Sequence, residues 1–152
     1  MEYHSEDRIN QVLPGLFIGN INCATDDQQL ADHDIQYVLN MCRTDSKAHW
    51  MDNNNYLHAY MHDGECSYEK FIDFMKQGSE FLHKSLSDGA NILVHCKLGK
   101  SRSASVIIYY LMFYQGYSLD LAMQLLKEAR PTIELNIHFT CHLTRYETLI
   151  NS

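Results

Sequence analysis

The segment from residue 91 to about residue 114 constrains the fold most strongly, because it joins an apolar strand, a polar turn and an apolar helix. Residues 91–95 (Asn-Ile-Leu-Val-His) form a short apolar run that is typical of a buried strand. Residues 96–102 contain a glycine and several polar side chains, as expected for a loop. A helix is expected from about Ser103, and because it is apolar nearly all round, we expect it to be buried. This succession predicts an α/β domain.

The rest of the chain alternates strand-like and helix-like stretches. The predicted strands cover 12–18, divided into a pair by Pro14 and Gly15, then 35–41 and 56–61. The predicted helices cover 26–34, 67–88 with Ser67 as cap, 118–130 with Ser118 as cap, and 136–150. The order of these elements predicts a central, mostly parallel sheet flanked by helices. We expect one catalytic domain over residues 1–152, since this length suits a single core.

Composition limits the class of function. With 12 basic and 19 acidic residues, the net charge of −7 provides no overall field to attract nucleic acid or an acidic membrane. The longest strongly apolar run, residues 106–114, is far shorter than the roughly 20 residues that a membrane span needs. The first four residues do not resemble a signal peptide, and the five cysteines form no C-x-x-C pair. We therefore expect reduced thiols and a soluble cytoplasmic protein, with the nucleus as an alternative.

The loop after the buried strand carries the chemistry. It has the form H-C-x5-R-S, with His95 before Cys96 and Ser103 after Arg102. This spacing allows the backbone N–H groups to point inward while the next helix directs its positive end at the same point, which makes an anion cradle. Arg102 can close the cradle with a planar fork that matches two phosphate oxygens. The positive surroundings are expected to hold Cys96 as a thiolate nucleophile. The phosphate-binding residues are then Lys97, Leu98, Gly99, Lys100, Ser101 and Arg102.

This loop resembles the phosphate-binding loop of the cysteine-dependent protein tyrosine phosphatase superfamily, and the surrounding chain is similar to its small dual-specificity branch. The similar segments are 13–19, 38–40, Arg130-Pro131, Asn136, Phe139 and Tyr146-Glu147. The resemblance implies that His95 orients the loop and tunes the thiolate. It also implies that Ser103 hydrogen-bonds Cys96 and helps the intermediate to break down. Leu98 and Leu135 depart from the family pattern, which has alanine and proline at these positions in many members.

A phosphate ester needs a general acid to protonate its leaving oxygen. In the dual-specificity branch this acid is an aspartate some thirty residues before the cysteine, and Asp63 lies 33 residues before Cys96. Glu65 is the rival acid, and Asp63 could instead simply begin a turn, since Asp-Gly is a common turn pair. The family position and the adjacent Gly64 favour Asp63 on a mobile loop.

Other side chains are open to two interpretations. Lys97 and Lys100 would rim the phosphate pocket and favour polyanionic substrates, although lysines in a turn are ordinarily solvated. His58, His62 and Cys66 have helical spacing for zinc, but the intervening Asp-Gly pair argues against a helix. We expect no metal and no cofactor.

Cys42 is the candidate redox partner of Cys96. It follows the predicted strand 35–41, and parallel strands deliver their carboxyl ends to the same edge of a sheet. Cys66 is the alternative partner, and Cys42 is otherwise a small buried residue.

These observations predict a phosphoprotein phosphatase that hydrolyses phosphotyrosine and phosphoserine or phosphothreonine through a cysteinyl-phosphate intermediate. Its expected partner is a phosphorylated protein; nucleic acid is not expected, and the sequence does not indicate an oligomeric state. A phosphoinositide phosphatase that uses the same site is an alternative. A phosphoprotein-binding module without turnover is another, but Asp63, Cys96 and Arg102 are all present.

Overall fold

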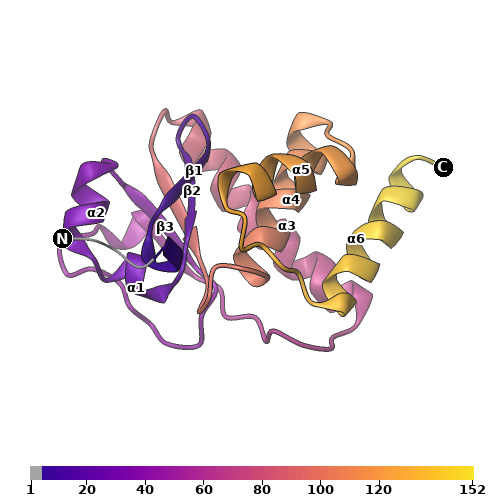
Figure 1. Cartoon of the computed structure of the whole chain (residues 1–152), viewed down its shortest axis with the longest axis horizontal. Helices are drawn as coiled ribbons and strands as arrows, with labels where there is room; N and C mark the ends of the chain where they lie inside the picture. Colours follow the sequence, from indigo (N-terminus) through magenta and orange to yellow (C-terminus); the bar gives the residue numbers. More distant parts are fainter. Residues whose placement is uncertain (1–4) are drawn as a thin grey trace.

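The computed structural model describes residues 5–152 and is built on one five-stranded sheet with the order β1-β2-β5-β3-β4 (Figure 1). The strands are β1 (Asn10–Leu13), β2 (Leu16–Gly19), β3 (Tyr37–Asn40), β4 (Tyr56–His58) and β5 (Ile92–His95). Strand β1 is antiparallel to β2, and the other three pairings are parallel. The predicted mostly parallel sheet is confirmed.

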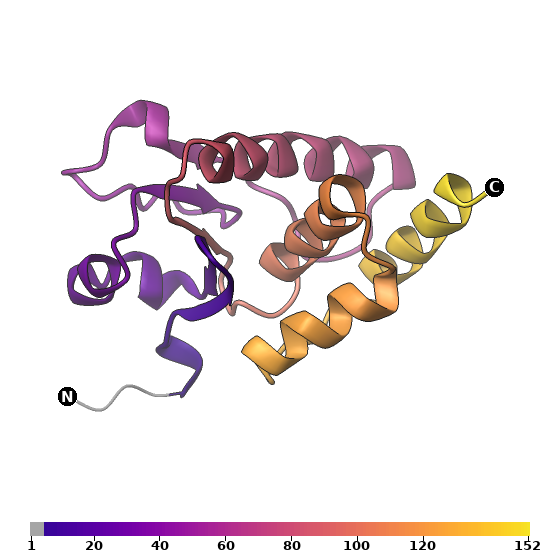
Figure 2. The same cartoon turned by 90° about the horizontal axis from the view of Figure 1, so that it is seen from above.

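Helices cover both faces of the sheet (Figure 2). They are α1 (Ile21–Ala24), α2 (Asp27–Asp32), α3 (Tyr68–Ser87), α4 (Arg102–Gln115), α5 (Leu119–Ala129) and α6 (Ile137–Ile150). Because side chains alternate along a strand, β5 contributes to two cores. Leu93 packs with Leu30 of α2, whereas Ile92 and Val94 join the larger core beneath α3 to α6. Strand β5 is thus buried completely, as its apolar sequence predicts.

Side-chain caps determine where three helices begin. Ser67, Ser118 and Asn136 accept hydrogen bonds from main-chain N–H groups in the first turns of α3, α5 and α6. The sequence predicts these starts correctly because such caps replace missing helical hydrogen bonds. No helix within residues 5–152 is both long enough and apolar enough to cross a bilayer.

Among the α-helices and strands, α1 and β4 differ most from the expectation. The short helix α1, capped by the Asn20 side chain, was not predicted. Strand β4 ends at His58, although strand was predicted to residue 61. Beyond it, Ala59 N–H still bonds to the Asn40 carbonyl at 2.8 Å, but the ladder does not continue as regular strand.

The topology brings the ends of three strands to one edge of the sheet. Strand β5 lies between β2 and β3, and His95 is in register with Gly19 on one side and Asn40 on the other. The next residue, Cys96, therefore leaves the sheet at its centre, directly before the loop that leads into α4. Ligand sites in α/β sheets lie at such carboxyl edges.

Candidate active site

Cys96 lies at the base of the loop between β5 and α4 and is only 2% exposed. The Gly99 N–H donates to the Cys96 Sγ at 3.3 Å, and the Ser103 hydroxyl lies 3.2 Å from the same sulfur. Helix α4 begins at Arg102, so its N-terminal dipole is directed toward the loop. The Gly99 N–H and the helix dipole therefore place partial positive charge beside the sulfur. The structure thus brings Cys96 and Ser103 together.

Arg102, at the other end of the loop sequence, is also buried. Its Nη1 donates to the carbonyl oxygens of Met41 at 3.3 Å and Met61 at 3.1 Å, which fixes the guanidinium between β3 and the segment before Asp63. Its Nε is buried without a hydrogen-bond partner among residues 5–152. A buried donor without a partner is costly, so this group suits an oxyanion held by the loop.

Asp63 is held close to this loop by Asn136. The Asn136 side-chain amide donates to Asp63 Oδ1 at 2.6 Å, and its main-chain N–H donates to Ser101 Oγ at 3.0 Å. Asp63 lines the same cavity as Cys96 and Arg102, whereas Glu65 is not among the residues that line it. Asp63, and not Glu65, thus shares a cavity with the cysteine.

This cavity has a volume of about 490 Å³. Its remaining walls come from the loop itself and from the segment before α6, including Glu134 and Leu135. Lys97 and Lys100 are both among its lining residues. Lys100 also forms an ion pair with Glu6, with Nζ and Oε1 3.6 Å apart.

Beside it lies a second cavity of about 400 Å³ that shares Asp63, Lys97 and Arg102 with the first. Its other lining residues include Arg43 and Thr44, which follow β3. Neither Arg43 nor Lys97 forms an ion pair with another residue in the range 5–152. A second positively charged surface thus adjoins the loop.

His95 and Cys42 are in contact behind the loop. The Cys42 Sγ lies 3.6 Å from His95 Nδ1, and both side chains are buried. Burial lowers the pKa of His95 to about 4, and burial raises the pKa of Cys42 to about 11. Both groups are therefore neutral at pH 7, and the negative charge of Cys96 adds to the rise at Cys42.

The three side chains with helical spacing for zinc, His58, His62 and Cys66, do not form a metal site. His58 contacts the Cys42 carbonyl at 2.7 Å, and the segment from His62 to Cys66 is a loop and not a helix. Within residues 5–152 there is no group of three or more metal-ligating side chains.

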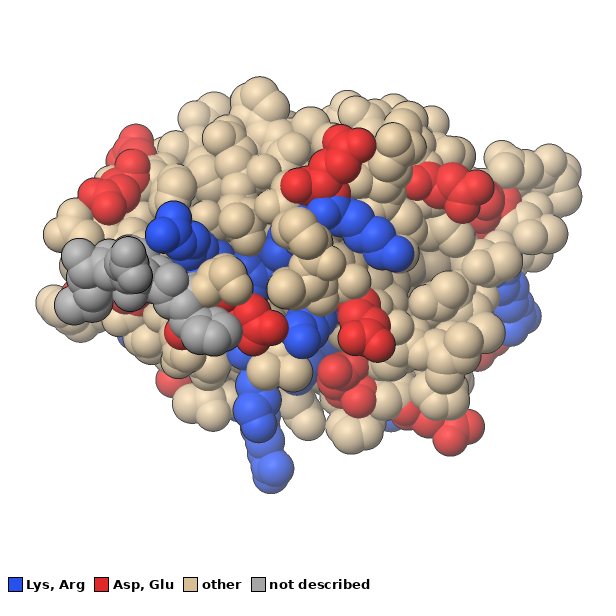
Figure 3. All heavy atoms as spheres, viewed as in Figure 1, with Lys and Arg blue, Asp and Glu red and all other residues tan. Residues whose placement is uncertain are grey.

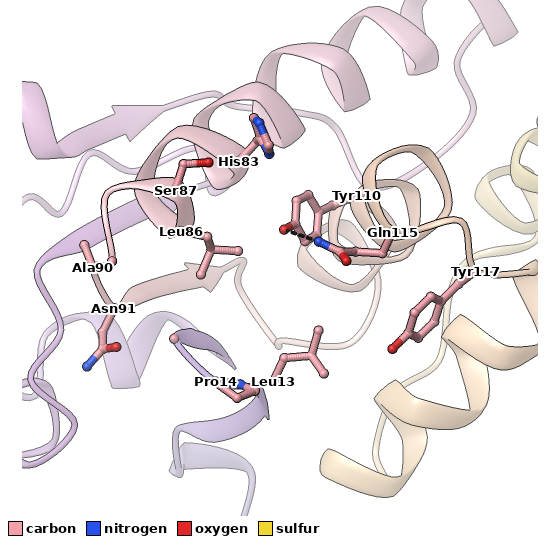
Figure 4. Close-up of a pocket in the computed structure, with 12 residues that line it drawn as sticks. Leu13, Pro14, His83, Leu86, Ser87, Ala90, Asn91, Tyr110, Gln115 and Tyr117 are labelled. Carbon is pink, nitrogen blue, oxygen red and sulfur yellow. Dashed lines mark hydrogen bonds between the residues drawn. The ribbon is translucent and has the colours of Figure 1, made fainter.

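A larger cavity of about 690 Å³ lies at the other end of β5, between the β1–β2 turn and the carboxyl ends of α3 and α4 (Figure 4). In it, Gln115 donates to the Tyr110 hydroxyl at 3.0 Å, and Tyr117 lies on the wall. Its lining contains no cysteine, carboxylate, lysine or arginine. It therefore offers no cysteine nucleophile and no lysine or arginine to bind phosphate.

Three side chains that support the loop were not identified as site residues from the sequence. Asn136 links the loop to Asp63, and Arg130 donates to the Gly99 carbonyl at 2.9 Å. Asn40 accepts a hydrogen bond from Cys42 N–H at 2.8 Å and shapes the turn after β3. Asn136 and the Arg130-Pro131 pair belong to the family resemblance, and this was the available signal.

The chain matches dual specificity phosphatases in sequence. The sequence model for the family described as "Dual specificity phosphatase, catalytic domain" matches residues 16–149. Mouse dual specificity phosphatase 28 is 32% identical over 142 residues, which cover 93% of this chain and 85% of that protein. Human dual specificity protein phosphatase 16 is also 32% identical over 142 residues, but these make up only 21% of its length. The chain thus spans about a fifth of the length of some curated relatives.

Solved structures agree with the sequence matches. Human DUSP28 superposes with a TM-score of 0.82 at 28% identity and covers 95% of both chains. A mouse dual specificity phosphatase, solved in complex with zinc tungstate, superposes with a TM-score of 0.81 at 30% identity, over 99% of this chain and 93% of the other. The loop, the fold and these matches together show that the chain belongs to the dual specificity phosphatase catalytic-domain family.

Proposed function

We propose that this chain hydrolyses phosphate monoesters of phosphorylated proteins, with Cys96 as nucleophile. The observation that carries the proposal is the convergence of Cys96, Arg102 and Asp63 on one cavity, with an N–H donor at the sulfur. The names of the related phosphatases give independent support. A module that binds phosphoproteins without turnover is not favoured, because such a module needs neither a nucleophile nor an acid.

In the first step the loop N–H groups and Arg102 bind the phosphoryl oxygens. The Cys96 thiolate attacks phosphorus, and the bond between phosphorus and the ester oxygen breaks. Asp63 gives its proton to that leaving oxygen, so a neutral alcohol or phenol departs. The products of this step are the dephosphorylated side chain and a cysteinyl phosphate on Cys96.

In the second step a water molecule attacks phosphorus, and the Asp63 carboxylate takes the proton of that water. The bond between phosphorus and sulfur breaks, and Cys96 leaves as a thiolate. The Ser103 hydroxyl, 3.2 Å from the sulfur, stabilises this leaving thiolate by hydrogen bonding. Inorganic phosphate is released, and the enzyme returns to its first state.

The finer proposal concerns substrate choice. We infer that phosphotyrosine and phosphoserine or phosphothreonine are both accepted, and that an additional negative group near the scissile phosphate improves binding. Lys97 and Arg43 support this inference, because both line the second cavity and neither is ion-paired within the described residues. Lys100 contributes less, since Glu6 lies 3.6 Å from its ammonium.

A protein substrate is favoured over a phosphoinositide in a membrane. On the face seen in Figure 3, basic side chains are interspersed with acidic ones and do not form a broad basic surface for a membrane. The five free cysteines support a reducing compartment such as the cytoplasm.

The test is phosphate release by the purified chain from four substrates. These are p-nitrophenyl phosphate, a phosphotyrosine peptide, a doubly phosphorylated peptide and phosphoinositide vesicles. We expect activity on the first three, and Arg43→Ala or Lys97→Ala should reduce activity on the doubly phosphorylated peptide most. Lys84→Ala, on the exposed side of α3, is the charge-matched control. Absence of turnover on every substrate contradicts the proposed function, and equal losses on all substrates contradict the finer proposal.

A further inference from the structure

Arg130, which follows α5, is a buried cation whose hydrogen bonds within residues 5–152 all go to carbonyl oxygens. The side chain is 2% exposed, and its guanidinium makes five hydrogen bonds. The acceptors are the main-chain carbonyls of Gly99 (2.9 Å), Leu98 (3.3 Å), Arg8 (2.9 Å) and Glu6 (2.7 Å), and the Asn10 amide oxygen (2.8 Å). Burying a charge costs several kcal/mol unless hydrogen bonds replace water, and here five do so.

The acceptors form two groups that are far apart in the sequence. Gly99 and Leu98 belong to the phosphate loop, whereas Glu6, Arg8 and Asn10 belong to the N-terminal segment. Arg130 lies between the two groups. The Glu6 carboxylate adds a second link, since it pairs with Lys100 of the loop at 3.6 Å.

The position of Arg130 determines which way the loop peptides face. In a trans peptide the C=O and the next N–H point in opposite directions. Because the Leu98 carbonyl faces Arg130, the Gly99 N–H of the same peptide faces the other way, and it donates to Cys96 Sγ at 3.3 Å. Likewise, the Gly99 carbonyl faces Arg130, which directs the Lys100 N–H away from it. The guanidinium therefore holds the N–H groups of the cradle inward.

Gly99 shows how closely the guanidinium packs on the loop. Its φ of +70° is in the left-handed region, and a Cβ there would lie 2.7 Å from Arg130 Nη2 and 2.7 Å from the Gly19 carbonyl oxygen. Only glycine fits between these groups without strain. The loop thus has one close-packed face against Arg130 and β2, and its other face lines the cavity.

We propose that Arg130 is a positioning residue for the phosphate loop, and that Glu6, Arg8 and Asn10, which supply its other hydrogen-bond acceptors, help to position the loop through it. The inference rests on the proposed function, because it assigns a task within that reaction. Residues 6, 8 and 10 all precede the part of the chain matched by the family model, residues 16–149. The N-terminal segment therefore extends the site beyond the recognised domain.

The test compares full-length wild type with Arg130→Met, Arg130→Lys and a truncation that begins at Ile9. Lys127→Met, an exposed charge loss three residues earlier on α5, is the matched control. Three measurements are made: the dissociation constant for tungstate by calorimetry, kcat and KM on p-nitrophenyl phosphate, and folding by circular dichroism. Tungstate binding needs no turnover, so it tests the loop even where catalysis fails.

For Arg130→Met we expect tungstate affinity and kcat/KM each to fall at least about tenfold, because loop N–H groups lose their orientation. Arg130→Lys should keep the fold and still lose affinity, since one ammonium cannot reach all five acceptors. The truncation should show a smaller loss in the same direction, and Lys127→Met should match wild type.

A folded Arg130→Met protein with wild-type tungstate affinity and kcat/KM overturns the inference. If Arg130→Met does not fold, Arg130→Lys and the truncation decide by the same criteria. A wild type that binds tungstate but releases no phosphate contradicts the proposed function alone, and the affinities of the variants still test the positioning. A wild type that binds no tungstate contradicts both.

Discussion

The Asn136 side-chain amide donates to Asp63 Oδ1 at 2.6 Å across 73 positions of sequence. The Oδ1 atom of the same asparagine caps α6 by accepting the Phe139 N–H at 2.9 Å, and its main-chain N–H donates to Ser101 Oγ. One residue thus fixes a helix start, the phosphate loop and the proposed acid. This arrangement makes the position of Asp63 depend on α6.

Asn136→Ala should therefore reduce kcat by about tenfold, because Asp63 loses the donor that orients it. The same change should cost roughly 1 kcal/mol of stability, since the α6 cap is lost. Asn136→Asp separates the two effects: an aspartate retains the cap but places a second carboxylate against Asp63. We expect its melting temperature to approach that of wild type while its kcat stays low. A fully active Asn136→Asp protein would show that the amide does not position the acid.

The pH dependence of kcat/KM identifies the acid. The rate needs Cys96 as a thiolate and Asp63 protonated, so it should rise and then fall as the pH increases. Asp63→Asn should lower the rate and remove the decline on the alkaline side. Glu65→Gln is the matched control and should leave the profile unchanged, because Glu65 does not line the cavity. If the two variants exchange these behaviours, Glu65 is the acid.

His95 should make stability depend on pH. Its folded pKa of about 4 lies below the ordinary value of 6.5, because the buried ring excludes the charged form. A depressed pKa contributes stability that is fully present above pH 6.5 and is lost as the pH falls from 6.5 through 4. The difference is worth about 3 kcal/mol. Urea unfolding at several pH values between 7 and 4 measures it.

His95→Asn is the comparison variant, because asparagine cannot take up a proton in this range. Its free energy of unfolding should fall less steeply between pH 6.5 and 4 than that of wild type, whatever its absolute stability. Equal slopes for the two proteins would mean that His95 is not responsible for the dependence.

Mild oxidation should join Cys96 to Cys42. Peroxide converts the Cys96 thiolate to a sulfenic acid with release of hydroxide, and the Cys42 thiol then displaces the new hydroxyl group as water, forming a disulfide. The raised pKa of Cys42, about 11, keeps it protonated at neutral pH, so the disulfide should form more slowly than the sulfenic acid. Peptide mapping after peroxide treatment detects the linkage.

Cys42→Ser should abolish recovery by thiols after oxidation, while Cys66→Ser should not. Mapping that finds only oxidised acids of Cys96, together with normal recovery of Cys42→Ser, would rule the pair out. A linkage of Cys96 to Cys66 would instead assign the role to the acid loop.

The parts of the fold predicted from sequence are those with local signals. Capped amphipathic helices such as α3 and the apolar strand β5 are specified by their own residues. Helix α1 was missed because its four residues have no periodicity to detect. Strand β4 was predicted too long because pairing with β3, and not composition, ends it at His58.

The site likewise contains residues that the sequence identifies and contacts that it does not. The residues of the phosphate loop are contiguous in sequence, so their spacing identifies them. The contacts of Arg130 with Glu6 and of Asn136 with Asp63 span 124 and 73 positions. Only the folded chain brings such residues together. A main-chain carbonyl can accept a hydrogen bond at any residue type, so the acceptor's sequence does not reveal the contact. The contacts by which Arg130 and Asn136 support the loop could therefore be identified only from the structure.

Cys96→Ser tests whether Cys96 is the nucleophile. The hydroxyl should not ionise in the loop, while the N–H groups and Arg102 remain in place to bind an oxyanion. We predict that the folded Cys96→Ser protein releases no phosphate from p-nitrophenyl phosphate above background and still binds tungstate with an affinity within about tenfold of wild type. Turnover by Cys96→Ser at the wild-type rate would show that Cys96 is not the nucleophile.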